Sequence, residues 1–286
     1  MKNRLGVLAA TAAAVVMLAG CAAGSPAEPA ATAGDAMGDA TSSAPEGLVN
    51  EGQLSACIDP EYAPLEYYAD GSGGEIIGFD ADGIRALAEQ WGVEANMVVT
   101  SFDGLMPGLQ SGTCDMIFGG LYITDERLEI ADAAPVMNAG SSILATPELA
   151  PQLSEPADLC GLTVAVQAAS SNELELQDLN ETECADDPMK IQSYPKTAET
   201  VLAVINGLAD ALTETNVATA YMASQNEGQL EVADIFPTNV EFGVFTKKDS
   251  PVSDAVAEGL RELFDDGTLA AIAVDYDLSE SIVDVY

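Results

Sequence analysis

The stretch from residue 114 to residue 127 combines residue types that could hold a small anion. An apolar run at 116–118 predicts a buried strand, and Gly119 and Gly120 follow it directly. Because glycine has no side chain, the backbone can approach a ligand closely at such a pair. The end of this strand is therefore a candidate binding site, with backbone N–H groups as donors.

Arg127 lies in the first turn of the helix predicted after this strand, where a cation is unexpected. Thr124 predicts the N-cap of that helix, and a cation in the first turn opposes the helix dipole by roughly 0.3 kcal/mol or more. An anion beside the glycines would remove the conflict, because a guanidinium can bind a carboxylate through two parallel hydrogen bonds. The alternative is a surface ion pair with Glu126 or Glu129.

Two other predicted strands also end in residues suited to ligand binding. One ends at Asp59, with Tyr62 close behind, and a later one ends near Ser170 and Ser171. Ligands of open α/β sheets bind beyond the carboxyl ends of the strands. These strand ends belong to two different predicted units, so a shared ligand would lie in the cleft between the units. The alternative for the serine pair is a helix N-cap.

Strands and helices alternate along the chain, which is typical of mostly parallel α/β units with helices on both faces. The pattern restarts after the proline-rich stretch 147–157 and finally returns to the first unit. We therefore expect lobe 1 at 48–143 plus 244–286, and an inserted lobe 2 at 144–243. The crossing segments are expected near 143–146 and 241–245. Strands are predicted at 53–58, 76–79, 93–99, 116–118, 140–146, 162–167, 189–193, 211–213 and 241–246. Helices are predicted from Asp80 or Asp82 to Trp91, at 102–109, from Thr124, from Asn172, and at 198–207, 217–225, 251–264 and 267–275.

Residues 1–20 have the features of an export signal peptide. Two cations precede an apolar run at 5–18 that is too short to span a bilayer. The tetrapeptide L-A-G-C at 18–21 resembles a bacterial lipobox, whose cysteine, here Cys21, carries lipid and becomes the new N-terminus. The alternative is an ordinary signal peptide with a chance cysteine. Residues 21–47 are mostly small and polar and predict a flexible tether. No other segment predicts a membrane span.

The acidic composition excludes several classes of function. The net charge is −38, and it becomes −40 once the two cations of the first 20 residues are removed. Nucleic acid is excluded as a partner, because no basic patch is available to contact phosphates. The chain has no histidine, which excludes histidine catalysis and histidine metal sites, and we expect no metal and no cofactor.

Four cysteines remain after Cys21, an even number that suggests two disulfides in an exported chain. Three connectivities are possible. Cys160 and Cys184 flank one segment of the second unit, and we expect Cys57 and Cys114 both to lie on strands of the first, so we favour the pairs 57–114 and 160–184. Metal binding is the alternative, but no CxxC spacing supports it.

Seven short stretches follow one another in a recognisable order. They are D-P-E-Y-A-P at 59–64, I-G-F-D-A-D at 77–82, F-D-G-L-M-P-G-L at 102–109, S-G-T-C-D at 111–115, Y-I-T-D-E-R at 122–127, D-L-C-G-L-T-V-A-V-Q at 158–167 and G-L-A-D-A at 207–211. Together they resemble the extracellular solute-binding proteins of family 3, the type that serves ABC importers of polar amino acids. The resemblance covers roughly residues 48–280. It implies a two-lobe periplasmic-binding-protein-like fold of type II, each lobe a mostly parallel sheet flanked by helices.

The resemblance also implies a role for each candidate site residue. The ligand side chain would lie between the rings of Tyr62 and Phe102, and Asp59 would face its distal, possibly cationic, end. The ligand carboxylate would be bound by Arg127, by backbone N–H groups in the stretch Gly119, Gly120 and Tyr122, and by Ser170 and Ser171 from the other lobe.

Two departures from the family pattern affect the expected ligand. Amino-acid binders usually carry an Asp, which pairs with the α-ammonium, at the position where this chain has Thr215. Glu214 or Asn216 is a possible substitute, but Glu214 should point to the opposite side if the backbone is extended. Tyr122 stands where a small Ser or Thr is usual. A carboxylate ligand without a primary α-amine, or with a quaternary nitrogen held by tyrosine rings, is therefore an alternative.

We expect a monomeric lipoprotein, anchored outside the cell membrane by Cys21, that passes a small polar ligand to the permease subunits of an ABC importer. Closure of the two lobes about a hinge would capture the ligand. One alternative is an enzyme of dehydratase type on the same scaffold. Its acids would be Asp59, Asp80 and Glu173, without Lys or His. The other alternative is a sensor that presents its closed form to a membrane receptor.

Overall fold

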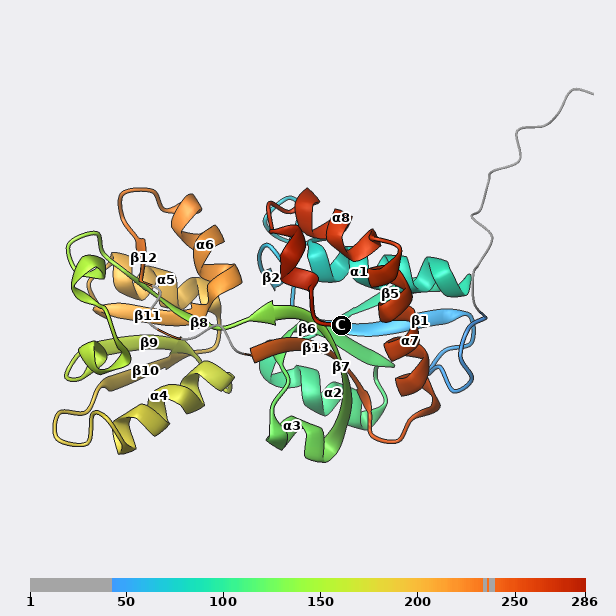
Figure 1. Ribbon diagram of the computed structural model, residues 1–286, viewed down its shortest axis with the longest axis horizontal. Helices are drawn as coiled ribbons and strands as arrows, with labels where there is room; N and C mark the ends of the chain where they lie inside the picture. Colours follow the sequence, from blue (N-terminus) through green and yellow to red (C-terminus); the bar gives the residue numbers. More distant parts are fainter. Residues whose placement is uncertain (1–42, 234–235, 237–239) are drawn as a thin grey trace, which may run out of the picture. The chain divides into compact units, whose positions relative to one another are not determined.

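Two five-stranded sheets, one in each of two lobes, form the centre of the protein (Figure 1). The computed structural model describes residues 43–233, 236 and 240–286. The strand order of the first sheet is β5 (Glu94–Val99), β1 (Gln53–Ile58), β6 (Met116–Tyr122), β13 (Val240–Lys247) and β7 (Ala131–Ala139). β1 is parallel to β5 and β6, whereas β13 is antiparallel to both of its neighbours.

The second sheet repeats this arrangement. Its order is β10 (Lys190–Tyr194), β9 (Thr163–Gln167), β11 (Ala211–Thr215), β8 (Ser141–Ala145) and β12 (Glu231–Ala233). β9 is parallel to β10 and β11, and β8 is antiparallel to β11 and β12. In each sheet, the parallel strands therefore end on one edge, where a ligand is expected to bind.

Helices cover both faces of the first sheet, because its strands are apolar on both sides. α1 (Phe79–Trp91), α7 (Pro251–Asp265) and α8 (Thr268–Asp275) share one core with the sheet, and α2 (Leu105–Ser111) shares another. Along β1, Ala56 and Ile58 face the first core and Cys57 faces the second, as the two-residue period of a strand requires. On α1, the predicted face of Ile84, Leu87, Ala88 and Trp91 is buried.

The second sheet is covered in the same way. α4 (Ser171–Glu181) packs on one face, and α5 (Thr197–Ile205) and α6 (Asn216–Gln225) pack on the other. The predicted α/β class and the insertion of one lobe in the other are confirmed, since the first sheet contains strands from both sides of the second lobe.

The chain passes between the sheets at Gly140 and again between Ala233 and Val240. The expected crossing segments, near 143–146 and 241–245, instead lie largely within β8 and β13. The sheets thus divide three or four residues earlier than the sequence pattern indicated. The reason is that the β7–β8 and β12–β13 passages are short, and the apolar runs on both sides of them are strand residues.

Gly78 begins α1, in place of the expected caps Asp80 or Asp82. Its φ is 122°, and a Cβ atom there would lie 2.1 Å from the carbonyl oxygen of Leu65, so only glycine fits. The strand expected at 76–79 is accordingly cut to β4 (Ile76–Ile77). β4 pairs with β3 (Glu66–Tyr68), which pairs with β2 (Glu61–Tyr62), in a small antiparallel sheet.

Four strands, β2, β3, β7 and β12, were not predicted; β2 and β3 are short and lie in and just after the region that the sequence indicated as a turn. β7 contains Pro135, and a proline, which has no N–H to donate, is unusual within a strand. The structure places β7 at the edge of the sheet, beside a register shift in β13, where a proline is tolerated. β12 has only three residues, too few to show a period.

Both disulfides form as predicted. Cys57 is bonded to Cys114 with Cα atoms 5.6 Å apart, and Cys160 is bonded to Cys184 with Cα atoms 5.2 Å apart. The first bond joins β1 to the residues before β6, and the second closes the segment that contains α4. Each bond therefore lies within one lobe and leaves the passages between the lobes unconstrained.

The predicted signal peptide and Cys21 lie outside the described residues. Of the predicted tether at 21–47, only its last five residues, from Ser43, are described, and Gly47 lies against Pro251 of the folded body. No helix in the described ranges is long and apolar enough to cross a membrane.

Candidate functional site

A small cavity of about 20 Å³ lies where the edges of the two sheets meet. It brings together eight of the ten residues predicted to bind the ligand, which are Tyr62, Phe102, Gly120, Tyr122 and Arg127 from the first lobe, and Ser170, Ser171 and Thr215 from the second. It also contains Gln167 and Asn172, which were not predicted, and Glu214, which was considered as a substitute for the usual Asp but was expected to point away. Of the two remaining predicted residues, Asp59 lines a neighbouring cavity, and Gly119 is buried behind the site.

Arg127 supplies the positive charge of this cavity. Thr124 caps α3 (Asp125–Ile130) as predicted, with its hydroxyl accepting from the Arg127 N–H at 3.3 Å. The guanidinium is partly buried and donates from Nη1 to the Tyr122 carbonyl at 2.7 Å. Within the described residues it forms no ion pair, so the alternative pairing with Glu126 or Glu129 is not observed. Loss of water around the group lowers the pKa of Arg127. An anion in the cavity would compensate for the lost water.

The glycine pair plays a different role from the one expected. Gly120 has a φ of 57°, and its N–H donates to Asp80 Oδ2 at 2.9 Å, so this donor is already engaged. A Cβ atom at Gly120 would lie 2.7 Å from the ring of Tyr62, and one at Gly119 would lie 3.2 Å from Glu66 Oε1. The glycines are therefore needed for close packing of Tyr62 and Glu66 against β6, and the expected N–H donation by Gly120 to a ligand is wrong for this structure.

Glu66 and Asp80 form a buried carboxyl pair behind the glycines; Glu66 is 1% exposed and Asp80 is 2% exposed. Burial raises the pKa of Asp80 to about 6. The pKa of Glu66 rises well above its usual range, because of burial and then because of the charge of Asp80. When Glu66 holds a proton, the pair carries a single negative charge, on Asp80. The Asp80 carboxylate accepts the Gly120 N–H and so holds the end of β6 in place.

Tyr62 and Tyr122 bring aromatic rings to the cavity from the first lobe. The Tyr62 hydroxyl reaches the second lobe, where it donates to Glu214 Oε1 at 2.9 Å and lies 2.6 Å from the Thr215 hydroxyl. Burial, and then the nearby Glu214, raise the pKa of Tyr62 well above its usual range. The ring of Tyr122 stacks on Phe242, with centroids 5.2 Å apart. Its hydroxyl is buried beside Ser141 without a hydrogen bond of normal geometry.

Glu214 reaches the cavity, although strand alternation predicted that it would point away. Its side chain is 3% exposed, and its Oε1 accepts the N–H of the next residue, Thr215, at 2.8 Å. Thr215 is the N-cap of α6, and its hydroxyl accepts from the Ala218 N–H at 3.3 Å. Because the chain turns from strand to helix at this cap, the long Glu214 side chain can fold back beside the short Thr215. Burial raises the pKa of Glu214.

The serine pair begins α4, as the N-cap alternative predicted. Ser170 is the N-cap: its hydroxyl accepts the Glu173 N–H at 3.1 Å and donates to the Gln167 carbonyl at 2.7 Å. Ser171, the first residue of the helix, lines the cavity. The N-terminus of α4 therefore faces Arg127 across the site, and its positive dipole end also favours an anion.

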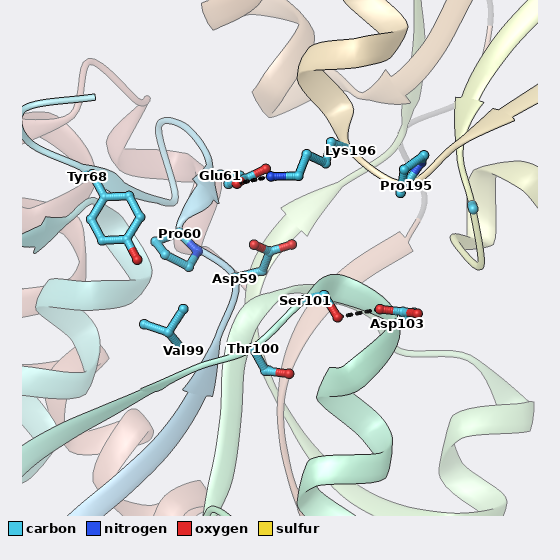
Figure 2. A pocket seen from close by; sticks show the side chains of 11 residues that line it. Asp59, Pro60, Glu61, Tyr68, Val99, Thr100, Ser101, Asp103, Pro195 and Lys196 are labelled. Atoms are coloured by element: carbon cyan, nitrogen blue, oxygen red, sulfur yellow. Dashed lines mark hydrogen bonds and ion pairs between the residues drawn. The ribbon is translucent and has the colours of Figure 1, made fainter. Parts of the chain in front are cut away.

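Asp59 lies in a wider cavity of about 410 Å³ beside the first one (Figure 2). Burial, followed by the charge of Glu61, raises the pKa of Asp59 to about 6. Figure 2 shows Glu61 paired with Lys196 of the second lobe, at 2.5 Å. A third cavity, of about 520 Å³, shares Arg127 and other residues with the small one and has a mostly apolar lining.

The described residues hold no group of three or more Cys, Asp or Glu side chains arranged to bind a metal ion. The site thus consists of one cation, one acid, three aromatic rings and a helix N-terminus. These groups are suited to hold a small polar molecule through direct contacts with the protein.

Residues 54–278 match the family model for bacterial extracellular solute-binding proteins, family 3, and the chain belongs to this family. Its relatives include the arginine-binding protein ArgT of Corynebacterium glutamicum, which is 31% identical over 244 residues, or 84% of this chain and 79% of that protein. The L-cystine-binding protein TcyJ of Escherichia coli is 27% identical over 240 residues, covering 80% and 86%.

Solved structures agree with the assigned fold. An amino acid ABC transporter substrate-binding protein of Streptococcus pneumoniae, bound to L-arginine, superposes with a TM-score of 0.71 at 28% identity, covering 81% of this chain and 96% of that chain. An ancestral amino acid-binding protein, described as a precursor of cyclohexadienyl dehydratase, gives 0.70 at 29% identity, covering 79% and 95%. The chain is therefore a solute-binding protein of type II fold.

Proposed function

We propose that this chain is the extracytoplasmic substrate-binding lipoprotein of an ABC importer, and that it captures a small polar ligand that bears a carboxylate. Arg127 carries the proposal. It is a partly buried guanidinium at the boundary of the two lobes, it faces the N-terminus of a helix, and it has no ion pair among the described side chains. A ligand carboxylate would satisfy both the guanidinium and the helix end.

Capture would occur by hinge closure. Only the passages at Gly140 and before Val240 join the two sheets, and neither disulfide crosses them. Each lobe can therefore move as a rigid body about these two short segments. The ligand would contact Arg127 on one lobe and α4 on the other, so it would bind the closed form more tightly than the open form, as a population shift requires.

The names of the relatives support the amino-acid class. They include proteins named for binding arginine, L-cystine and histidine, and one structural neighbour contains L-arginine. We propose that the ligand of this chain is an amino acid or a molecule like one. The permease subunits of the importer would receive it from the closed lobes.

We propose that the protein binds its ligand without transforming it. The dehydratase-related neighbour makes an enzyme the natural competing idea, and Glu214 is an acid with a raised pKa within the cavity. This acid, however, has four hydrogen-bond partners in the protein, which hold it in place as a binding group rather than as a mobile acid or base. Recovery of a chemically altered ligand after incubation with the protein would support the enzyme.

A thermal-shift screen tests the proposal directly. The compounds are the common L-α-amino acids, L-cystine, glycine betaine, ectoine and simple carboxylates such as succinate. A ligand of the closed form raises Tm with increasing concentration, because it binds only the folded state. The proposal expects the largest shift from a molecule with a carboxylate. If the largest shift comes from a molecule without any anionic group, the assignment of Arg127 is wrong.

A further inference from the structure

The small cavity beside Arg127 can hold only a small part of a ligand. Its volume is about 20 Å³. A space of that size holds about one water molecule. The rest of a molecule whose carboxylate pairs with Arg127 must therefore lie in a neighbouring space. Two larger cavities are candidates, the Asp59 cavity of about 410 Å³ and the third cavity of about 520 Å³.

The third cavity is continuous with the small one, because Phe102, Arg127 and Ser171 line both. Phe102 and Arg127 belong to the first lobe, and Ser171 begins α4 of the second lobe. The shared wall thus contains both groups expected to bind the carboxylate, the guanidinium and the helix N-terminus. In contrast, no described residue lines both the small cavity and the Asp59 cavity. This geometry favours the third cavity as the place for the rest of the ligand.

The walls of the third cavity are mainly apolar and come from both lobes. The large apolar side chains among them are Phe102, Leu105, Met106, Leu121, Ile130 and Leu174. An apolar group that enters this space would leave water and would also cover part of these side chains, and both changes favour binding. A polar group would lose its hydrogen bonds to water without finding many partners here.

Ile130 and Leu174 lie at this cavity on opposite lobes and are unusually exposed for large apolar residues, at 47% and 53%. Ile130 follows Arg127 by three residues on α3, and Leu174 follows Ser171 by three residues on α4. Residues three apart on a helix lie on the same face. Each lobe therefore presents one group for a carboxylate and, one turn further along, one apolar side chain.

The charges in the lining restrict the ligand further. Arg127 is the only cation among the described residues that line the third cavity. Asp103 and Glu126 also line it, at exposed positions where water solvates them, and they would repel a second anionic group of the ligand. The Asp59 cavity has a different character, because it holds three acids together with Lys196, which pairs with Glu61.

We propose that the ligand is a monocarboxylate with a large apolar side group, either aliphatic or aromatic, and that this group lies in the third cavity while the carboxylate pairs with Arg127. The inference rests on the function proposed above and names the remainder of the ligand. Ile130 and Leu174 are specificity-determining residues in this scheme. The expected ligand differs from the arginine for which the relative of Corynebacterium glutamicum is named.

The test is isothermal titration calorimetry with the wild type, Ile130→Gln, Leu174→Gln and a matched control, Leu202→Gln. Leu202 lies on α5 of the second lobe, is 55% exposed and does not line the third cavity. All three changes replace an exposed apolar side chain with a polar one, and circular dichroism checks that each variant is folded. The apolar probes are L-leucine, L-phenylalanine and 3-phenylpropionate, and the polar probes are L-arginine, L-glutamine and succinate.

We expect the wild type to bind the best apolar probe at least about tenfold more tightly than any polar probe, since one methylene group in an apolar pocket already changes affinity by about tenfold or more. Ile130 and Leu174 are half exposed, so each Gln variant should weaken this binding by a smaller factor, about fivefold. The double variant should weaken it by about the product of the two factors, because the two sites lie on different lobes. Leu202→Gln should bind within about twofold of the wild type.

Two results would overturn the inference. The first is tighter binding of a polar probe than of every apolar probe; if that probe is L-arginine and Asp59→Asn weakens its binding, the rest of the ligand lies in the Asp59 cavity. The second is wild-type affinity for the best apolar probe in the folded double variant. In both cases a carboxylate still binds, so the proposed function stands, whereas no binding of any carboxylate would reject the inference and the proposed function together.

Discussion

Arg127→Ala removes the positive charge from the cavity between the lobes, and we expect it to be the most damaging single change to ligand binding. The guanidinium has five N–H donors, of which the structure commits one group, Nη1, to the Tyr122 carbonyl. The remaining donors are available to a ligand carboxylate. Alanine would remove them and leave the carboxylate facing only the N-terminus of α4.

The size of the effect follows from the type of bond. A charge-assisted hydrogen bond contributes about 1.5–3 kcal/mol, and a bidentate pair contributes more. The affinity should therefore fall by roughly tenfold to a few hundredfold. Arg127→Lys should recover little, because one ammonium group cannot hold the Tyr122 carbonyl and form two parallel bonds to a carboxylate.

Calorimetric titration with the amino acid that gives the largest thermal shift measures this loss. Arg261→Ala is a matched control, because Arg261 lies over the ring of Tyr286, 4.4 Å from its centroid, and does not line the cavity. The control should lose some stability and keep its affinity. If folded Arg127→Ala binds within about twofold of the wild type, the carboxylate does not bind where we place it.

Three further predictions concern stability and location. Replacing both Cys160 and Cys184 with Ser should lower the unfolding free energy by about 3 kcal/mol, because the bond closes a loop with a sequence separation of 24; an unchanged urea midpoint would contradict this. Burial raises the pKa of Asp80 to about 6, so the folded state binds the proton on Asp80 more tightly than the unfolded chain does. The stability that this protonation adds is fully present below about pH 4 and is lost as the pH rises through about 6. Tm of the wild type should thus be higher at pH 5 than at pH 7. In Asp80→Asn, which keeps an acceptor for Gly120, Tm should change less between these two pH values. The same change in the variant and the wild type would refute the role of Asp80. Cys21→Ala should move the protein from the membrane fraction to the soluble fraction, and a variant that stays in the membrane pellet would reject the lipid anchor.

Much of the fold could be predicted from local patterns. The run at 53–58 forms β1 with the predicted bounds, because a short, mostly apolar stretch can be buried on both faces. The cap at Thr124 also formed as predicted, since capping depends on a hydroxyl and an N–H three residues apart. The division between lobes was displaced by a few residues, because strand membership depends on pairing with distant segments.

The residues of the candidate site were predicted more accurately than the hydrogen-bonding role of each residue. Eight predicted residues meet in one cavity, because the ends of parallel strands converge at one edge of each sheet. The Gly120 N–H, however, donates to Asp80, and the Ser170 hydroxyl donates to the Gln167 carbonyl and accepts from the first turn of α4. Such partners cannot be identified from strand and helix patterns, because Asp80 lies forty residues from Gly120.

The sequence by itself determined the α/β class and the position of Arg127 after a strand and a cap, because each depends on residue type and short spacing. It left three cysteine pairings possible and favoured the one that the structure shows. Only the tertiary structure decided that Glu214 faces the site. Strand alternation placed its side chain on the opposite face, but the turn into α6 and the length of the side chain bring its carboxyl group to Tyr62 of the other lobe, 152 residues away. Contacts between residues so far apart in the sequence depend on how the two lobes pack together. Strand and helix periodicity does not specify that packing.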